Sequence, residues 1–401
     1  MLELPKLPLI ILRRHAFKLL FSILLIASCL VLADMLFEQY RRQYVLDIPV
    51  KQAHALGARF VVGYDDPAAV TILARRGLIA GIFVSKHNAQ GKSLVALQQE
   101  ILSIQTARLS AGLPLLIVAT DQEGGPVSRL SPPLGYQPPL SSLLNAGQTQ
   151  VKPDIQAFHY GVEQGRALAH LGVNVNYSPV VDIKSQRATG MFDFFSRINS
   201  RAISNDPAMV VTMASAYSQG LAAAGVMATL KHFPGLGEVA ADTHLFSANL
   251  NTPVQTLRQR DWLPFRQVLG QTDALMMLAH VTLPSLDAQW PVSLSRAVVQ
   301  GVIRQSWQHE GVLVTDDLTM RAAQKHGTCG ATVAALNAGV DLLLLSYQHE
   351  RYYSAMHCAA VALKAGKLDA ALMTSSAERL DRLNQRLLAT TTSPAPRLQL
   401  R

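Results

Sequence analysis

The sequence is poor in cysteine and in charged residues. It has three cysteines, Cys29, Cys329 and Cys358, and their spacing fits no metal-binding motif. Charged residues make up 16% of the chain and apolar residues 49%, which excludes a disordered protein and leaves enough apolar material for a large core. Of the three cysteines, only Cys329 and Cys358 could pair outside the cell, and we expect both to be free thiols.

Several common catalytic and binding motifs are missing. The sequence contains no G-x-G-x-x-G after a strand pattern, no Walker loop, no G-x-S-x-G and no H-E-x-x-H, so we expect no metal and no organic cofactor. Beyond residue 42 the chain holds 30 Lys/Arg and 24 Asp/Glu, a net charge of +6, without basic blocks. Nucleic acid is therefore not an expected partner, and the mild charge suits either an anionic envelope surface or an ordinary soluble one.

One long apolar run lies near the N-terminus. Residues 19–37 carry a single charge, Asp34, and basic residues cluster just before them at 13–18, as in a signal anchor or signal peptide. Because the run continues past Cys29, we expect an uncleaved single-pass anchor; cleavage after Ala33 or before Cys29 are the alternatives. The positive-inside rule then places the body outside the cytoplasmic membrane, in the periplasm or at the cell surface.

Eight short apolar runs follow, each succeeded by a helical pattern. Continuous hydrophobicity is typical of parallel strands covered on both faces, and eight alternations favour a closed barrel over an open sheet. The expected fold is α/β, a single (β/α)8 TIM-type barrel preceded by an N-terminal transmembrane helix. The eight runs are 59–64, 81–85, 115–121, 173–182, 226–232, 274–281, 311–317 and 340–346.

No Pro/Gly/Ser linker divides the barrel region, so we expect one catalytic domain. The predicted segments are a cytoplasmic tip and anchor (1–38), a neck (39–57), the barrel (58–388) and a flexible tail (389–401). Helical spacing in 370–388 predicts that this stretch completes the last unit.

Polar residues stand where five of the predicted strands end. They are Asp121, Asp182, Lys231 with His232, His280, and Asp316 with Asp317. Because active sites of (β/α)8 barrels are built at the carboxyl ends of the strands, these side chains are expected to converge on one pocket.

Four segments resemble the signature blocks of glycoside hydrolase family 3, in that family's order. They are DQEGGPVSRL (121–130), KHFPGLGEVAADTH (231–244), MLAHVTLPSLD with PVSLS (277–295) and GVLVTDDLTM (311–320). The resemblance spans about residues 57–385, and within the family the chain looks like the single-domain bacterial β-N-acetylglucosaminidases.

The resemblance implies a retaining reaction with Asp316 as nucleophile and His244 as general acid/base, its imidazole held by Asp242. If the strand persists, Asp316 and Asp317 should point to different sides, and Asp317 is expected to cap the next helix.

The same resemblance implies which residues bind the sugar. They are Asp121, Arg129, Arg201, Lys231 and His232; Arg201 has the weakest match, because NSRAIS only loosely follows the family's R-S-F-G block. Two positions depart from the pattern: Pro126 replaces an Arg and Leu236 replaces a His, and neither removes a residue with an assigned role.

The implied function is a β-N-acetylhexosaminidase that removes terminal N-acetylglucosamine from glycans, with peptidoglycan fragments as the expected substrate. The alternatives are a family member with another sugar preference, a phosphorylase, or a non-catalytic membrane-bound sugar-binding protein. A monomer is expected.

Overall fold

The structure is a computed structural model that describes residues 9–144, 151–185, 197–239 and 248–392. The chain divides into two compact units, residues 1–48 and residues 49–401.

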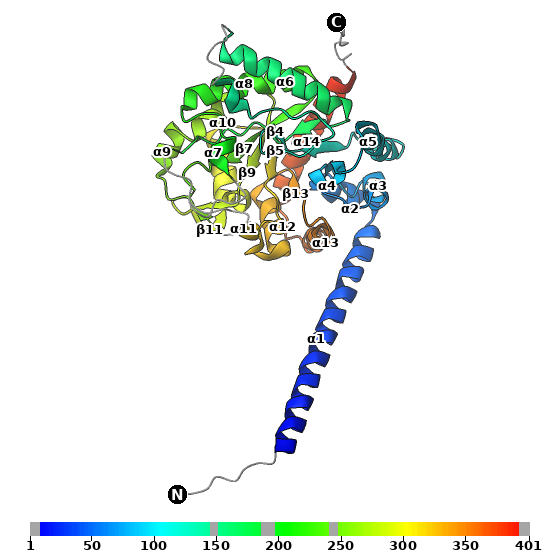
Figure 1. Ribbon diagram of the computed structural model, residues 1–401. Coiled ribbons are helices and arrows are strands. Elements are labelled where there is room, and N and C mark those ends of the chain that lie inside the picture. Colours follow the sequence, from blue (N-terminus) through cyan, green and yellow to red (C-terminus); the bar gives the residue numbers. More distant parts are fainter. Residues whose placement is uncertain (1–8, 145–150, 186–196, 240–247, 393–401) are drawn as a thin grey trace, which may run out of the picture. The chain divides into compact units, whose positions relative to one another are not determined.

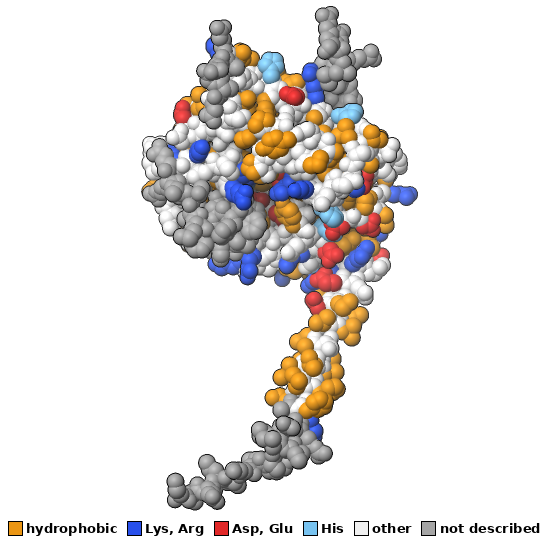
Figure 2. Space-filling model, viewed as in Figure 1, with side chains coloured by type: hydrophobic (Ala, Val, Ile, Leu, Met, Phe, Trp, Pro, Cys, Tyr) orange, Lys and Arg blue, Asp and Glu red, His pale blue; other side chains and the backbone are white. Residues whose placement is uncertain are grey.

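The first unit is dominated by one long helix, α1 (Leu9–Leu46). Within it, Phe17–Leu46 is long and apolar enough to cross a membrane. Figure 2 shows hydrophobic side chains coating the helix, and its large apolar residues between 17 and 37 are 45–69% exposed.

The second unit is built on a parallel eight-stranded sheet (Figure 1). Each predicted apolar run contains one of these strands, although most strands are shorter than the runs. In sheet order the strands are β12 (Leu313–Thr315), β9 (Leu275–Leu278), β7 (Met227–Phe233), β6 (Val175–Asn176), β3 (Ile117–Thr120), β2 (Gly81–Phe83), β1 (Phe60–Val62) and β13 (Leu343–Leu345).

The two ends of the sheet meet, so that it forms a nearly closed barrel. β13 pairs with β1, with Phe60 opposite Leu343. On its other side β13 approaches β12 through a single parallel bridge, Val314 to Leu342, and the Thr315 N–H donates to the Leu342 carbonyl at 2.9 Å. The predicted α/β class and cyclic strand order are therefore confirmed, with a weak seam between β12 and β13.

The barrel interior is filled by alternate residues of the strands. The buried core cluster includes Ile117 and Ala119 from β3, Met227 from β7, and Val312 and Val314 from the β12 region. Because side chains alternate across a strand, these series define which later residues also face inward. Leu380, Leu383 and Leu387 of α14 (Ala370–Thr392) belong to the same cluster, so this last helix contributes to the barrel core.

Helices cover the sheet. α6 packs against α8 along the upper side in Figure 1, where a Cβ on Gly161 would lie only 2.4 Å from the Tyr217 carbonyl oxygen, so the close helix approach requires glycine there. Before α14, the described helices of this unit are α2 (Val50–Gly57), α3 (Pro67–Arg75), α4 (Lys86–Ala89), α5 (Leu94–Leu109), α6 (Pro153–His170), α7 (Ile198–Arg201), α8 (Pro207–Ala223), α9 (Val254–Gln259), α10 (Trp262–Leu269), α11 (Arg321–Gln324), α12 (Gly327–Ala338) and α13 (Arg351–Lys364). There are also two described 3-10 helices, η1 (Leu140–Leu144) and η2 (Val292–Leu294), and a π-helix, η3 (Ala297–Ser306).

Short strands lie within several of the loops that follow the barrel strands. β4 (Gln122–Gly124) and β5 (Val127–Ser128) form an antiparallel hairpin directly after β3. β8 (Ala248–Asn249), β10 (Val281–Leu283) and β11 (Asp287–Pro291) form a three-stranded sheet from loops after β7 and β9.

Cys329 and Cys358 form a disulfide that joins α12 to α13. The expectation of two free thiols is wrong. The sequence alone could not reveal the pairing, because it depends on two helices bringing their Cα atoms to 5.3 Å.

Candidate active site

Because side chains alternate along a strand, three of the predicted residues belong to the inward-facing series and lie at the carboxyl edge of the barrel. Asp121 follows Ile117 and Ala119 in the inward series, and Asp316 follows Val312 and Val314. Lys231 continues the series of Met227 in the same way and is 2% exposed. These side chains therefore stand above the apolar core, on the strand ends where barrel enzymes bind their ligands.

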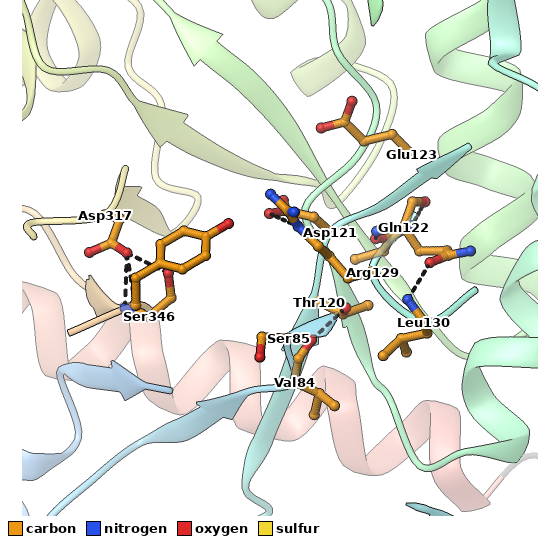
Figure 3. A network of polar contacts seen from close by, with 12 residues as sticks. Val84, Ser85, Thr120, Asp121, Gln122, Glu123, Arg129, Leu130, Asp317 and Ser346 are labelled. Atoms are coloured by element: carbon orange, nitrogen blue, oxygen red, sulfur yellow. Dashed lines mark hydrogen bonds and ion pairs between the residues drawn. The ribbon is translucent and has the colours of Figure 1, made fainter. Parts of the chain in front are cut away.

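The β4–β5 hairpin explains the eight-residue spacing between Asp121 and Arg129. Its turn uses Gly124 and Gly125, both with positive φ, and the Arg129 N–H returns to the Asp121 carbonyl at 3.1 Å. Figure 3 shows the two side chains together, with Arg129 Nε 3.9 Å from Asp121 Oδ2. Pro126, which replaces an Arg of the family pattern, is an exposed residue of this turn.

Lys231 is held between two carboxylates. Its Nζ lies 2.6 Å from Asp121 Oδ1 and 2.7 Å from Glu123 Oε1. A buried ammonium group needs such partners, because its desolvation is otherwise uncompensated.

Glu123 also binds Arg201 through a two-pronged contact. Arg201 Nε donates to Oε2 at 2.9 Å and Nη2 donates to Oε1 at 2.7 Å. Burial opposes the charge of this carboxylate, but Arg201 and Lys231 together lower the pKa of Glu123 to about 2. Glu123 is thus ionised, and its hydrogen bonds hold Arg201 and Lys231 in place.

His232 links this cluster to Asp182. Its Nδ1 lies 2.7 Å from Asp182 Oδ2 and its Nε2 lies 3.3 Å from Arg201 Nη2. A guanidinium N–H only donates, so Nε2 accepts and the proton resides on Nδ1, where it is donated to Asp182. These two contacts hold the imidazole in one orientation.

Asp182 also holds the start of the loop that follows β7. It is fully buried and accepts the Leu236 N–H at 2.7 Å. Leu236, which replaces a His of the family pattern, thus contributes its backbone N–H to the site, while its side chain is buried. The predicted acid/base pair Asp242 and His244 lies further along this loop, outside the described residues.

Asp316 and Asp317 occupy a turn rather than a continued strand, since β12 ends at Thr315. The Asp316 N–H donates to the Leu278 carbonyl at 2.8 Å, and Asp316 Oδ1 accepts the Asp317 N–H at 2.8 Å. The nucleophile candidate is therefore positioned by the backbone on both sides of it.

Asp317 does not cap a helix, so that expectation is wrong. α11 begins only at Arg321, and Asp317 Oδ1 accepts the Thr319 N–H at 2.8 Å within a tight turn. Its Oδ2 accepts the Ser346 N–H at 3.1 Å and the Ser346 hydroxyl (Figure 3). Asp317 thus ties the turn of Asp316 to the end of β13.

Tyr347 is a site residue that the sequence reading missed. Its N–H donates to Asp317 Oδ2 at 3.2 Å, its side chain is 54% exposed, and the Arg129 guanidinium lies 5.8 Å from its ring centre. A partly exposed ring beside a cation at this edge offers an apolar face to a sugar ring.

The structure brings all five predicted binding residues into one network, which is balanced in charge. Asp121, Glu123 and Asp182 face the three cations, the ammonium of Lys231 and the guanidiniums of Arg129 and Arg201. Sequence reasoning missed Glu123 and the role of Asp182, although Glu123 stands two residues after Asp121. In the described ranges, no group of three or more His, Cys, Asp or Glu side chains is arranged to hold a metal ion.

The chain resembles known proteins over most of its length. Residues 59–383 match the family model described as "Glycosyl hydrolase family 3 N terminal domain". A protein of Tolumonas auensis named "Beta-hexosaminidase" is 34% identical over 71% of this chain and 80% of its own length.

Solved structures agree. A family 3 β-N-acetylglucosaminidase from Paenibacillus sp. is 27% identical with a TM-score of 0.77, covering 86% of this chain. The match covers 64% of that longer protein. A family 3 glycosyl hydrolase from Mycobacterium smegmatis is 29% identical with a TM-score of 0.73, covering 84% of this chain and 98% of that one.

Proposed function

The chain belongs to glycosyl hydrolase family 3, and from that membership we propose that it removes terminal N-acetylglucosamine from glycans with retention of configuration. It is a glycoside hydrolase acting on O-glycosyl bonds, and similar proteins carry the names β-hexosaminidase and β-N-acetylglucosaminidase. The observation that carries the mechanism is the position of Asp316, which directly follows β12 in a turn fixed by the Leu278 carbonyl and the Asp317 N–H.

In the first step, Asp316 attacks the anomeric carbon and forms a glycosyl ester. The bond from that carbon to the leaving oxygen breaks, and His244 gives its proton to that oxygen. In the second step, His244 takes a proton from water, whose oxygen displaces Asp316 and releases the sugar. Two inversions give net retention.

Asp242 would accept a hydrogen bond from the His244 imidazole and stabilise its charged form before the first step. In most glycosidases a second carboxylic acid is the general acid/base, the role that is proposed here for His244. Because both residues follow the Leu236 turn, Asp182 would fix where their loop begins.

The charge balance of the binding network suits a neutral sugar. Lys231 and Arg201 are paired with carboxylates before any ligand binds, so both cations present fixed hydrogen-bond donors rather than unpaired charges. Asp121, Arg129, Arg201, Lys231 and His232 are the proposed sugar contacts. Such a set distinguishes hydroxyl positions by geometry.

We also propose the finer architecture and placement of the chain. The nearly closed sheet is taken as a TIM-type barrel over 58–388, with an anchor at 1–38, a neck at 39–57 and a tail at 389–401. The apolar Phe17–Leu46 stretch supports a single membrane pass. The Cys329–Cys358 disulfide supports an extracytoplasmic body, because such bonds persist in oxidising compartments. Peptidoglycan fragments are the proposed glycan and a monomer the proposed state.

The test is hydrolysis of 4-nitrophenyl N-acetyl-β-D-glucosaminide beside the matching glucoside by the detergent-solubilised full chain. We expect activity on the aminosugar, with the β-anomer as the first product in NMR spectra. Asp316→Ala should lower kcat by at least ~10³-fold, and His244→Ala by ~10²–10⁴-fold with natural leaving groups.

Azide distinguishes a nucleophile from a structural residue. With Asp316→Ala, azide can enter the vacated face and restore turnover as the α-glycosyl azide. Undiminished hydrolysis by Asp316→Ala, or an α-anomer as the first product of the wild type, would contradict the mechanism.

A further inference from the structure

His280 is a buried histidine that the proposed mechanism does not use. It follows β9, is 1% exposed, and makes two hydrogen bonds. Its Nδ1 lies 2.7 Å from the Ser293 hydroxyl, and its Nε2 lies 3.0 Å from the Asp317 backbone carbonyl oxygen.

The partners determine its protonation. A carbonyl oxygen only accepts, so His280 Nε2 carries the hydrogen and donates it. Burial lowers the pKa of His280, although the nearby charges of Asp316 and Asp317 raise it. The ring is therefore neutral, and its bare Nδ1 accepts the Ser293 hydroxyl hydrogen.

The hydrogen bond from His280 acts on the residue that follows Asp316, at the peptide next to the one that donates to the Asp316 carboxylate. The Asp317 N–H donates to Asp316 Oδ1 at 2.8 Å, and the Asp317 carbonyl accepts from His280 at 3.0 Å. The Asp316 N–H donates to the Leu278 carbonyl at 2.8 Å and the Leu318 N–H to the Leu344 carbonyl at 2.9 Å, and His280 holds the Asp317 carbonyl that lies between these two contacts. A rotation of the Asp317 backbone would turn the N–H away from the Asp316 carboxylate.

We propose that His280 is a positioning residue for the nucleophile Asp316, and that the Ser293 hydroxyl holds the imidazole ring in the orientation that makes this possible. The inference rests on the proposed function, because it assumes Asp316 as nucleophile. Three hydrogen bonds connect these groups: the Ser293 hydroxyl contacts the imidazole, the imidazole binds the Asp317 carbonyl, and the Asp317 N–H binds Asp316 Oδ1. A displacement of about 1 Å at a reacting group can lower a rate ~10²-fold without preventing binding.

The experiment compares His280→Leu with His280→Gln in the full chain, using the 4-nitrophenyl aminosugar. Leu has no donor, whereas the Gln amide nitrogen can replace Nε2. We expect His280→Leu to lower kcat/KM for formation of the glycosyl ester ~10²-fold, with affinity for the product N-acetylglucosamine within about threefold of wild type. His280→Gln should recover to within about tenfold.

His309→Leu is the matched control. This histidine is half-buried, and desolvation lowers its pKa to about 4, but it lies outside the network of His280 and Asp316. The substitution should lower Tm and leave kcat/KM within about threefold. If His280→Leu and His280→Gln reduced kcat/KM equally, or product affinity fell in parallel with it, a structural role would replace the proposed one.

Ser293→Ala keeps the proposal testable should His280→Leu not fold. It retains the imidazole but removes the hydroxyl that holds Nδ1, and an approximately threefold to tenfold loss of kcat/KM is expected; wild-type kcat/KM would overturn the inference. Asp316→Ala is measured in parallel. Activity retained there defeats the proposed function, whereas an inactive Asp316→Ala with fully active His280→Leu and Ser293→Ala defeats this inference alone.

Discussion

At the scale of single residues, Glu123 shows how the site is assembled before substrate arrives. Both of its oxygens are engaged, one by Arg201 and Lys231 and the other by Arg201 alone. Removing its charge would leave two buried cations with too few partners. Glu123 is therefore expected to act on binding through the cations rather than by touching the sugar.

Glu123→Gln should raise KM at least tenfold and lower stability at neutral pH. The folded pKa of Glu123 lies near 2, below its ordinary 4.5, so its contribution is present above pH 4.5 and lost as pH falls toward 2. At full ionisation it is on the order of 3 kcal/mol. Urea unfolding of both proteins at pH 3 and pH 7 measures this.

Glu100→Gln is the control for that variant. Glu100 pairs with Lys92 at 2.6 Å and accepts a hydrogen bond from the Tyr64 hydroxyl at 2.9 Å. A Gln at this position can still accept from Tyr64, so the substitution should cost less stability than Glu123→Gln and leave KM unchanged. An equal loss of stability for Glu123→Gln at pH 3 and pH 7 would contradict the role of its charge.

At the scale of elements, the start of α10 supports the turn that leads into the loop of His244. Asp261 directly precedes α10, and a Cβ on Gly235 would lie 3.0 Å from the Asp261 Cβ. Asp261 Oδ2 is buried and has no hydrogen-bond partner among the described residues. Burial accordingly raises the pKa of Asp261 to about 6.

Asp261→Asn should therefore stabilise the protein at neutral pH. Because the folded pKa is raised, the contribution of Asp261 is favourable below pH 4 and is lost as pH rises to 6. The variant should match the wild type at pH 4 and exceed it by about 1–3 kcal/mol at pH 7.5. Thermal unfolding at the two pH values measures the difference.

Asp369→Asn should show the opposite sign. Asp369 accepts a hydrogen bond from Arg296 at 2.9 Å, which lowers its pKa, so its substitution should destabilise at neutral pH and not at pH 2. A gain for Asp261→Asn that is equal at pH 4 and pH 7.5 would show that its charge is not responsible.

Periodicity made the strands predictable, but their lengths depend on neighbours. The run 173–182 contains a regular strand of two residues only, Val175–Asn176, and beyond it the pairing is reduced to single contacts such as the bridge from Val180 to Lys231. Inward parity was readable for Asp121, Lys231 and Asp316. The pairing of Glu123 with Arg201 spans 78 residues, and no local pattern indicates it.

At the scale of the whole molecule, the apolar helix and the disulfide point to one topology. Cys29 lies within α1 and is unpaired, whereas Cys329 and Cys358 are joined. The bond closes a loop of 29 residues, which corresponds to a stabilisation of about 3.6 kcal/mol in the chain-entropy account. Reduction should lower Tm accordingly, as it should not in Cys329→Ser/Cys358→Ser.

A membrane-impermeant maleimide tests this topology on intact cells whose outer layer has been opened. We expect labelling of Cys329 and Cys358 only after reduction, because the disulfide blocks both. Cys29 should stay unlabelled within the apolar segment, and the membrane fraction should contain the full 43.5 kDa chain. A shortened chain would indicate cleavage near Cys29 or Ala33. Labelling of Cys329 and Cys358 without reductant, and only in lysed cells, would place the catalytic body in the cytoplasm.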